Sequence, residues 1–405
     1  PETPLRPIVA CIHAPATPAS KLLNDLLAPI FITVNRKYTF INDIDVIRQL
    51  EKYATDGYLT STTKFITIDV ENLYTMIPRE GALASLALFC IKYSLHGKIG
   101  TFTIDHIMKV ARLILDTNCF AYNNKYYKQI RGGAMGSAFT QVLANIYIYI
   151  NDIFMTTNKT IDEIHFELEK AKNKDINIKI EPKISTSVHF LDVTITNDNG
   201  QLRTSIFHKP TAEPCILPYT SDHPRHIHRN IPYAALLRAA RICSHVNDFN
   251  SECTRIDISL LLNSYPPHFI TQHFNRFFHL NNAMPVFNHL NEHLYSRLHQ
   301  NLLYQPTRRD KQLQIMTQDP IRTPVVLQEK IWNRKLMFPR YLFDTGLTIN
   351  FRKEFSKWWK AFYAFPGSPV EQVKVRLIAN TNRTLENMFI HKKLPREMLT
   401  KMEAR

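Results

Sequence analysis

The sequence predicts a mixed α+β fold, with strands and helices alternating up to residue 210 and helices dominating the rest. Two patterns lead to this class. Apolar residues alternate in short runs bounded by turn residues before residue 210, and they recur with helical spacing after Pro224. With 405 residues, 44% of them hydrophobic and 21% charged, the chain can bury a sizeable core and has the composition of a folded protein.

Strands are marked most clearly in two places. The alternation in KFITIDV, residues 64–70, predicts a strand with Asp69 near its end. Further along, the runs SVHFLDVTI and LRTSIFHKP are each predicted to be a strand, and Asn199-Gly200 between them readily adopts positive φ. We therefore expect an antiparallel hairpin within residues 185–210.

Helical spacing of apolar residues predicts two helices in each half of the chain. The residues after Phe269 continue with helical stretches separated by prolines. The four clearest helical stretches are residues 80–93, 104–115, 233–243 and 253–262.

The change of pattern after residue 210 predicts three parts. They are residues 1–210, a small basic helical module at 211–280, and a basic helical extension at 281–405. The opening residues have the pattern of the middle of a domain, so we also expect a further segment upstream of Pro1.

Charge and cysteine content narrow the class of protein. Fifty Lys and Arg against 35 Asp and Glu give a net charge of +15, which favours a polyanionic partner such as nucleic acid. The weaker alternative is that the charge only keeps the protein soluble or arises by chance. The six cysteines include no CxxC pair and are expected to be reduced, buried thiols. No apolar stretch approaches the roughly 20 residues of a membrane-spanning helix, so we expect a nuclear or cytoplasmic protein that is neither secreted nor membrane-bound.

Three segments carry residues suited to nucleotide chemistry, although each has a plain structural explanation. TIDVENLY contains Asp69 and Tyr74, and an aspartate in a surface turn is the plain alternative. QIRGGAMGSAFTQVLANIYI has glycines that permit close backbone approach, and a flexible loop is the alternative. YINDIF places Asn151 and Asp152 between apolar residues, as an ordinary hairpin turn would.

Together these segments resemble the reverse transcriptases. PLRPIV, IDVENLYTMIP, GGAMGSAFTQVLANIY, YINDIF and HFLDVTI follow one another in the order found in that family. The sequence is similar to the Penelope-like class in particular, through LYTMIP, AMGS, FLDVTI and the later block SDHPRHIHRNIPYAALLRAARICS. The resemblance runs over almost the whole chain.

The resemblance implies an architecture and an activity. Residues 1–210 would form a right-hand polymerase palm, an antiparallel sheet with helices, together with partial fingers. Residues 211–280 would form a helix-turn-helix thumb. The implied activity is RNA-directed DNA polymerisation, with an RNA template and a DNA primer as partners and a dNTP as the only small-molecule ligand beside Mg²⁺.

The resemblance also assigns roles to individual residues. Asp69 and Asp152 would be the catalytic carboxylates that hold two Mg²⁺ ions, which nucleotidyl transfer requires. Tyr74 would lie under the sugar of the incoming nucleotide and exclude ribonucleotides. Three further residues would border the nucleotide, namely Arg6 from the fingers and Gly136 and Ser137 from the glycine loop.

The sequence departs from the family pattern at two points. The catalytic turn of the family is Tyr-x-Asp-Asp, but this chain has Asn151 in place of the first aspartate, which weakens Mg²⁺ binding because an amide lacks the anionic oxygen. The ANIY helix also runs into Tyr149 almost directly, where relatives have a loop of some twenty residues, so the palm is expected to be distorted or the helix shortened. These departures favour a second hypothesis, a catalytically inactive nucleic-acid-binding remnant, while an unstable relic is a third.

Two further clusters have competing explanations. The residues expected to contact phosphates in the helical module are Arg225, His226, Arg229, Arg238 and Arg241. A zinc site is the weaker alternative, because the spacing of Cys215, His223, His226, His228 and Cys243 matches no familiar finger. The aromatic residues Trp332, Trp358 and Trp359 lie among cations and could stack on single-stranded bases, but core packing of the Trp358-Trp359 pair is favoured.

Overall fold

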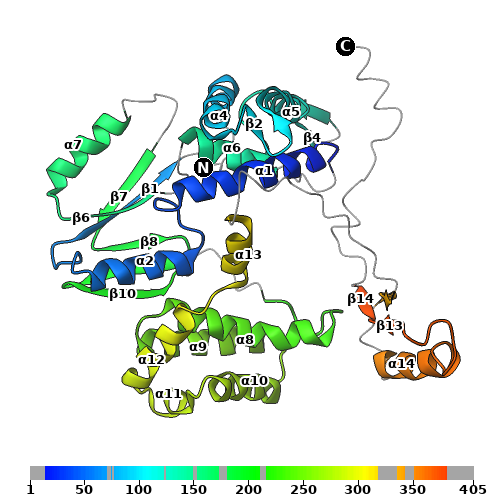
Figure 1. Ribbon diagram of the computed structural model, residues 1–405. Helices are drawn as coiled ribbons and strands as arrows, with labels where there is room; N and C mark the ends of the chain where they lie inside the picture. Colours follow the sequence, from blue (N-terminus) through cyan, green and yellow to red (C-terminus); the bar gives the residue numbers. More distant parts are fainter. Residues whose placement is uncertain are drawn as a thin grey trace. The chain divides into compact units, whose positions relative to one another are not determined.

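The computed structural model describes most of the chain and divides it into two compact units with mixed α/β structure (Figure 1). The described residues are 14–70, 74, 77–122, 125–148, 153–172, 180–209, 216–317, 335–342 and 351–380. The first unit comprises Pro1–His208, Arg241–His245 and His299–Val326, and the second comprises Lys209–Ala240, Val246–Leu298 and Leu327–Arg405.

A three-stranded antiparallel sheet forms the centre of the first unit. Its order is β6 (Ile153–Thr157), β1 (Lys64–Val70), β7 (Ile180–Ser185), which confirms the strand predicted at residues 64–70. On one face, Ile66 and Ile68 pack against helix α7 (Ile161–Lys172). Phe65 is fully buried on the other face, so β1 is covered on both sides.

The second sheet confirms the predicted hairpin and corrects one strand. Strands β9 (Val193–Asp198) and β10 (Gln201–Ile206) are joined by Asn199 and Gly200, whose φ angles are 51° and 92°. SVHFLDVTI is not one strand, because Leu191 has a φ of 53° and the chain reverses there. The run therefore forms two antiparallel strands, β8 (Ser187–Phe190) and β9.

Helix α2 (Asp43–Thr55) closes the apolar core between the two sheets. Asn42 caps this helix by accepting a hydrogen bond from the backbone N–H of Asp45. Buried residues of α2 pack with Phe65 of β1, with the inner face of β8 and β9, and with Ile242 and Leu303. Residues far apart in the sequence therefore share one core.

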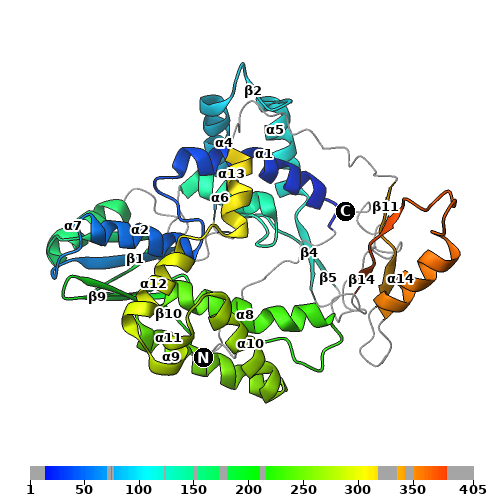
Figure 2. The ribbon, with the colours of Figure 1, turned by 60° about the horizontal axis from the view of Figure 1, so that its bottom comes forward.

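Four helices form the other part of the first unit around a second apolar core (Figures 1 and 2). They are α1 (Thr17–Asn35), α4 (Arg79–Tyr93), α5 (Ile104–Asp116) and α6 (Ala138–Ile148), and α4 and α5 confirm the two helices predicted in this half. Short antiparallel pairs flank the cluster: β2 (Lys98–Ile99) with β3 (Phe102–Thr103), and β4 (Cys119–Tyr122) with β5 (Lys125–Lys128).

Residues 299–317 return to the first unit and are held there by α2. Helix α12 (Glu292–Leu303) ends in this segment, and α13 (Arg308–Thr317) follows it. Glu51 accepts hydrogen bonds from His299 Nε2 at 3.0 Å and from Gln300 Nε2 at 2.9 Å. Burial opposes ionisation of Glu51, but the hydrogen bond and charge of His299, with Gln300 and Tyr304, outweigh it and hold the pKa of Glu51 below its ordinary value.

Arginines cap the carboxyl end of α12. The last carbonyls of a helix have no intrahelical donor. Arg48 donates from Nε to the carbonyl of Leu303 at 2.7 Å and from Nη1 to Asp310 at 3.1 Å, and Arg241 donates from Nε to the carbonyl of Leu302 at 2.9 Å. We call this set of contacts the α12 clasp.

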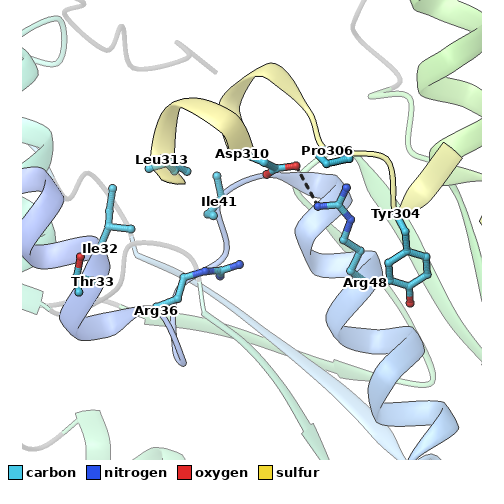
Figure 3. Close-up of a pocket in the computed structure, with 9 residues that line it drawn as sticks. All are labelled: Ile32, Thr33, Arg36, Ile41, Arg48, Tyr304, Pro306, Asp310 and Leu313. Atoms are coloured by element: carbon cyan, nitrogen blue, oxygen red, sulfur yellow. Dashed lines mark hydrogen bonds and ion pairs between the residues drawn. The ribbon is translucent and has the colours of Figure 1, made fainter. Parts of the chain in front are cut away.

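A pocket of about 470 Å³ lies beside the α12 clasp. Figure 3 shows Arg48 directed at Asp310, with Arg36 at the other side of the pocket. Both guanidinium groups are engaged, because Arg36 forms two hydrogen bonds of 3.0 Å with Asp45. The pocket is lined by Ile32, Thr33, Arg36, Ile41, Arg48, Tyr304, Pro306, Asp310 and Leu313.

Helices with an aromatic core make up most of the described second unit. Phe249 stacks on Tyr295 with ring centroids 4.9 Å apart, and Tyr233 meets Phe277 edge to face. The two helices predicted after residue 224 are confirmed, and both begin earlier than expected. The helices are α8 (Arg225–Ile242), α9 (Val246–Leu262), α10 (Pro267–Leu280) and α11 (Met284–His289), with the first part of α12.

The C-terminal part of the second unit contains strands that the predicted helical extension, residues 281–405, did not include. It contains helix α14 (Phe351–Phe362), but short apolar runs near prolines form parallel strand pairs instead of helices. The pairs are β11 (Leu336–Met337) with β13 (Lys374–Val375), and β12 (Arg340–Leu342) with β14 (Ile378–Asn380).

The four described cysteines form no disulfide, in agreement with the reduced thiols expected, but not all of them are buried. Cys90, Cys243 and Cys253 are buried, and burial raises the pKa of Cys90 to about 12. Cys119 is exposed on β4, contrary to the expectation. None of the helices in the described ranges has the length and apolar character needed to cross a membrane.

Candidate active site and nucleic-acid interface

Asp69 lies exposed at the end of β1, between two neighbouring strands. On the β6 side, Ile68 pairs with Ile153. Asn151 and Asp152 immediately precede β6 in the sequence, but they lie outside the described residues, as does Arg6. On the β7 side, the residue opposite Asp69 is Glu181.

Glu181 is a second exposed carboxylate that the sequence did not point to. Residues directly opposite each other in an antiparallel pair project from the same face of the sheet, so Asp69 and Glu181 share a face. Two like charges in this arrangement are unfavourable unless a cation lies nearby. No signal predicted this pairing, because strand β7 itself was not predicted.

The glycine loop lies against the segment that follows β1. Gly133 donates its backbone N–H to the carbonyl of Tyr74 at 2.8 Å, and Gly132 donates to the carbonyl of Ile77 at 3.0 Å. Gly132 has a φ of 59°, which favours glycine. The ring of Tyr74 packs, partly buried, against the core formed by α1, α4, α5 and α6. Two of the predicted motifs are therefore in direct contact.

Arg79 fixes the start of the glycine loop. Its Nε donates to the carbonyl of Gly132 at 3.0 Å, its Nη2 donates to the carbonyl of Gln129, and its Nη1 lies 3.8 Å from Asp116. Desolvation by burial lowers the pKa of Arg79, against the charge of Asp116, which raises it. Nothing near Arg79 in the sequence singles it out, because the two carbonyls that it binds are about fifty positions away.

Replacing Arg79 by Met is expected to lower the free energy of unfolding by about 1–3 kcal/mol, because two loop carbonyls lose their donor. Arg79→Lys should recover part of this loss. Chemical denaturation measures the effect, and limited proteolysis should show faster cleavage within residues 129–133. The matched control is Arg131→Met, which alters an exposed arginine in the same loop. Equal stability of the Arg79→Met and Arg131→Met proteins would contradict a holding role for Arg79.

Helix α1 fixes the other end of the loop. Ser20 Oγ accepts a hydrogen bond from the backbone N–H of Phe139 at 2.9 Å, which satisfies a donor in the first turn of α6. Ser137 is buried, with its Oγ 2.8 Å from that of Ser20. The side chain of Ser137 thus supports the loop from within, whereas Gly136 is exposed.

The connection between α6 and β6 is as short as the sequence indicates. Helix α6 continues to Ile148, with Leu143 and Ile146 buried in the core, so it is not shortened. Strand β6 begins at Ile153. Four residues, 149–152, lie between these elements and are outside the described ranges.

The predicted phosphate-contacting residues on α8 do not share one surface. Arg225, His226 and Arg229 are exposed in the first turns of the helix. Arg238 is half-buried and, at about 100° per residue, lies roughly opposite Arg229 around the helix axis. Arg241 is buried in the first unit and caps α12, so its guanidinium is directed at protein carbonyls.

Two of the histidines near α8, His223 and His228, have hydrogen-bond partners within the protein. His228 is buried, with Nδ1 3.2 Å from the hydroxyl of Tyr265 and Nε2 3.2 Å from the carbonyl of Ser221. His223 Nδ1 lies 2.7 Å from the hydroxyl of Ser221. In the part of the chain that the structure describes, no three His, Cys, Asp or Glu side chains are grouped as metal ligands, and Cys215 is outside that part.

The predicted core packing of the Trp358-Trp359 pair is wrong for Trp358. Its side chain is 66% exposed, and no residue of α14 is buried. Trp359 is half-buried. Trp332 lies outside the described residues.

Comparison with protein families identifies one segment. Residues 215–275 match the animal helix-turn-helix domain, a stretch that contains α8, α9 and part of α10. The match agrees with the two helices separated by a polar turn in this region. Comparison with curated proteins gives no match.

Among solved structures, the chain is similar to telomerase from Candida albicans in complex with the TWJ fragment of telomeric RNA. The TM-score is 0.50 at 10% identity, with 74% of this chain and 56% of that chain covered. Telomerase from Candida tropicalis in complex with a TWJ fragment gives 0.37 at 10% identity (79% and 56% covered), and its apo form gives 0.36 at 11% (70% and 55%). The chain spans about half the length of these telomerases, and it has a reverse-transcriptase-like fold.

Proposed function

We propose that this chain is the reverse-transcriptase core of a Penelope-like retroelement, an RNA-directed DNA polymerase by descent. The arrangement around Asp69 carries the proposal. A buried strand ends in this exposed carboxylate, the adjacent strand β6 directly follows Asn151 and Asp152 in the sequence, and the glycine loop is hydrogen-bonded to the segment after β1. The likeness of the fold to telomerase supports the same class of reaction.

In this proposal the sheet β6-β1-β7 is the palm, and Asp69 and Asp152 are the metal ligands. Carboxylate oxygens are the ligands that Mg²⁺ prefers, and the like-charged pair Asp69 and Glu181 favours a cation at this edge. When held by these residues, Mg²⁺ would supply the positive charge needed to activate the primer 3′-hydroxyl and to neutralise the leaving pyrophosphate. Tyr74 positions the sugar and excludes a 2′-hydroxyl, while Arg6 and Gly136 border the dNTP.

The proposed partners are an RNA template and a DNA primer. Helices α8 to α10 serve as the thumb, in which Arg225, His226 and Arg229 contact phosphates without reading sequence. The net charge of +15 and the telomeric RNA bound by the similar Candida albicans telomerase support a nucleic-acid partner. A protein with these partners would act in the nucleus or the cytoplasm.

Two observations favour a second candidate, a nucleic-acid-binding protein without polymerase activity. Asn151 replaces the first carboxylate of the catalytic turn, so the metal cage loses a charge. Only four residues separate α6 from β6, which leaves little chain for a strand ahead of the turn. The same fold would then retain its basic helices for binding RNA or DNA.

Template-directed incorporation of dNTP on poly(rA)/oligo(dT), with Mg²⁺ or Mn²⁺, separates the two candidates. The polymerase candidate predicts incorporation that Asp69→Ala abolishes and Asn151→Asp raises by at least tenfold, because a carboxylate returns to the metal cage. Folding of each variant is checked by circular dichroism. Incorporation that persists in Asp69→Ala would contradict the assignment of this residue. Strongly salt-dependent primer-template binding with no incorporation in any variant would favour the binding protein.

A further inference from the structure

An aromatic face runs along helix α14 in the second unit. Phe351, Phe355, Trp358 and Phe362 follow one another at intervals of four, three and four residues, which places them on one stripe of the helix. Apolar stripes of this kind usually face a core. Here Trp358 is 66% exposed and Phe362 is 69% exposed.

The rings of this stripe and of the adjacent Trp359 and Tyr363 contact one another and form an ordered array. Phe355 and Trp359 are nearly parallel, with centroids 6.4 Å apart, and Trp359 stacks on Tyr363 at 5.1 Å. Trp358 meets Phe362 edge to face at 6.3 Å. Trp359 Nε1 is buried without a hydrogen-bond partner among the described residues. The rings therefore offer flat surfaces in fixed relative positions.

The surroundings of this face are strongly basic. From Phe351 to Asn380, six Lys and Arg stand against two Glu. Both glutamates are engaged within the chain, because Glu354 pairs with Lys357 at 2.9 Å and Glu371 accepts a hydrogen bond from the backbone N–H of Gly367. The segment thus joins exposed rings to an excess of positive charge.

We propose that the aromatic face of α14 (Phe351, Phe355, Trp358, Trp359 and Phe362) binds single-stranded RNA. Unpaired bases stack on the exposed rings, and the cations contact the phosphates. Phosphates of a duplex would engage the cations but not the rings, and an apolar protein partner would engage the rings but not the cations. RNA is chosen over DNA because the proposed polymerase uses an RNA template, so this part of the inference rests on the proposed function.

The test measures binding of a fluorescent twelve-nucleotide oligo(U) to the full chain. Trp358→Ala is expected to weaken binding about tenfold without changing its salt dependence, since a stacking ring is lost and no charge. Trp358→Phe, which keeps a ring, should retain most of the affinity. Tyr38→Ala removes a ring that is 73% exposed in the first unit and is the matched control, with no expected effect.

Charge variants test the other half of the proposal. Arg352→Gln combined with Lys360→Gln should lower the slope of log K against log salt by about 1.4, because two phosphate contacts to a single strand are lost. Circular dichroism confirms that the helical content is retained.

Three outcomes would overturn the proposal. They are unchanged oligo(U) binding in Trp358→Ala, equal or tighter binding of oligo(dT), and loss of binding to anionic phospholipid vesicles in Trp358→Ala while oligo(U) binding persists. Binding of oligo(U) that depends on Trp358 in a protein that incorporates no dNTP would support this proposal and contradict the polymerase. Failure of one proposal is therefore distinguishable from failure of the other.

Discussion

Replacing Arg48 by Ala is expected to lower the free energy of unfolding by about 2–4 kcal/mol, as measured by chemical denaturation. Arg48 donates to the carbonyls of Leu303 and Gln305 and to the carboxylate of Asp310, all within the first unit. The substitution leaves carbonyls at the end of α12 without this donor and leaves Asp310 without its cation. The side chains of Arg48 and Asp310 are only 18% and 17% exposed, so water replaces these contacts poorly.

An exposed ion pair provides the control for Arg48. Arg112 makes two hydrogen bonds to Glu80, at 2.9 and 2.7 Å, but the two side chains are 53% and 76% exposed. Arg112→Ala should therefore destabilise the protein much less than Arg48→Ala, because solvent screens an exposed ion pair. Equal losses in Arg48→Ala and Arg112→Ala would show that the α12 clasp does not hold residues 299–317 in the way proposed.

The pH dependence of stability should also reflect the ion pair between Arg48 and Asp310. Burial opposes ionisation of Asp310, but hydrogen bonds from Thr307 and Arg48 outweigh it, so its pKa lies below the ordinary 3.8. The stabilisation from a depressed carboxyl pKa is present above the unfolded-state value and is lost as the pH falls through the folded-state value. Between about pH 5 and pH 2, the wild-type protein should therefore lose more stability than Arg48→Ala.

Local pattern predicted the elements whose signal lies within a few residues. The alternation in residues 64–70 and the Asn199-Gly200 turn were sufficient for β1 and for the β9–β10 hairpin. Strand β7 was missed because Pro182 argues against a strand, yet β7 is an edge strand, where proline is tolerated. Helix α7 was missed because its apolar pattern is short: the buried residues are Ile164 and Leu168, and the nearby Phe166 is exposed and does not follow the pattern.

In the candidate site, too, continuous motifs could be predicted from the sequence but contacts between distant residues could not. Asp69, Tyr74 and the glycine loop were found because their motifs are continuous in the sequence, whereas the residues that hold them were not. Arg48 and Leu303 are 255 positions apart, and nothing near either residue indicates the other. Arg241 was assigned to phosphates because a basic helix favours that interpretation, but tertiary packing directs its side chain to the end of α12.

Gly133→Ala is expected to destabilise the protein by about 1–3 kcal/mol, because the added methyl group has no space. An alanine Cβ at this position would lie 2.5 Å from Thr140 Oγ1 and 2.7 Å from Thr140 Cγ2. Thr140 is 2% exposed on α6 and cannot turn away from both contacts at once. Chemical denaturation measures the loss. The same substitution should weaken dNTP incorporation if the glycine loop borders the nucleotide.

The steric cause can be separated from other effects by a double-mutant cycle. Thr140→Ala removes both clashing atoms, so Gly133→Ala should cost at least about 1 kcal/mol less in that background. Gly81→Ala is the matched control, because an alanine Cβ at this position would meet Tyr147 at an ordinary distance of 3.4 Å. Gly81 lies in helix α4, where alanine is favoured over glycine by up to about 1 kcal/mol. The same change should thus have opposite signs at the two glycines. The contrary result is that Gly133→Ala lowers the free energy of unfolding equally in the wild-type and Thr140→Ala backgrounds. That result would show that the destabilisation arises in the backbone of the loop, and it would contradict close packing against α6 as the reason for glycine at this position.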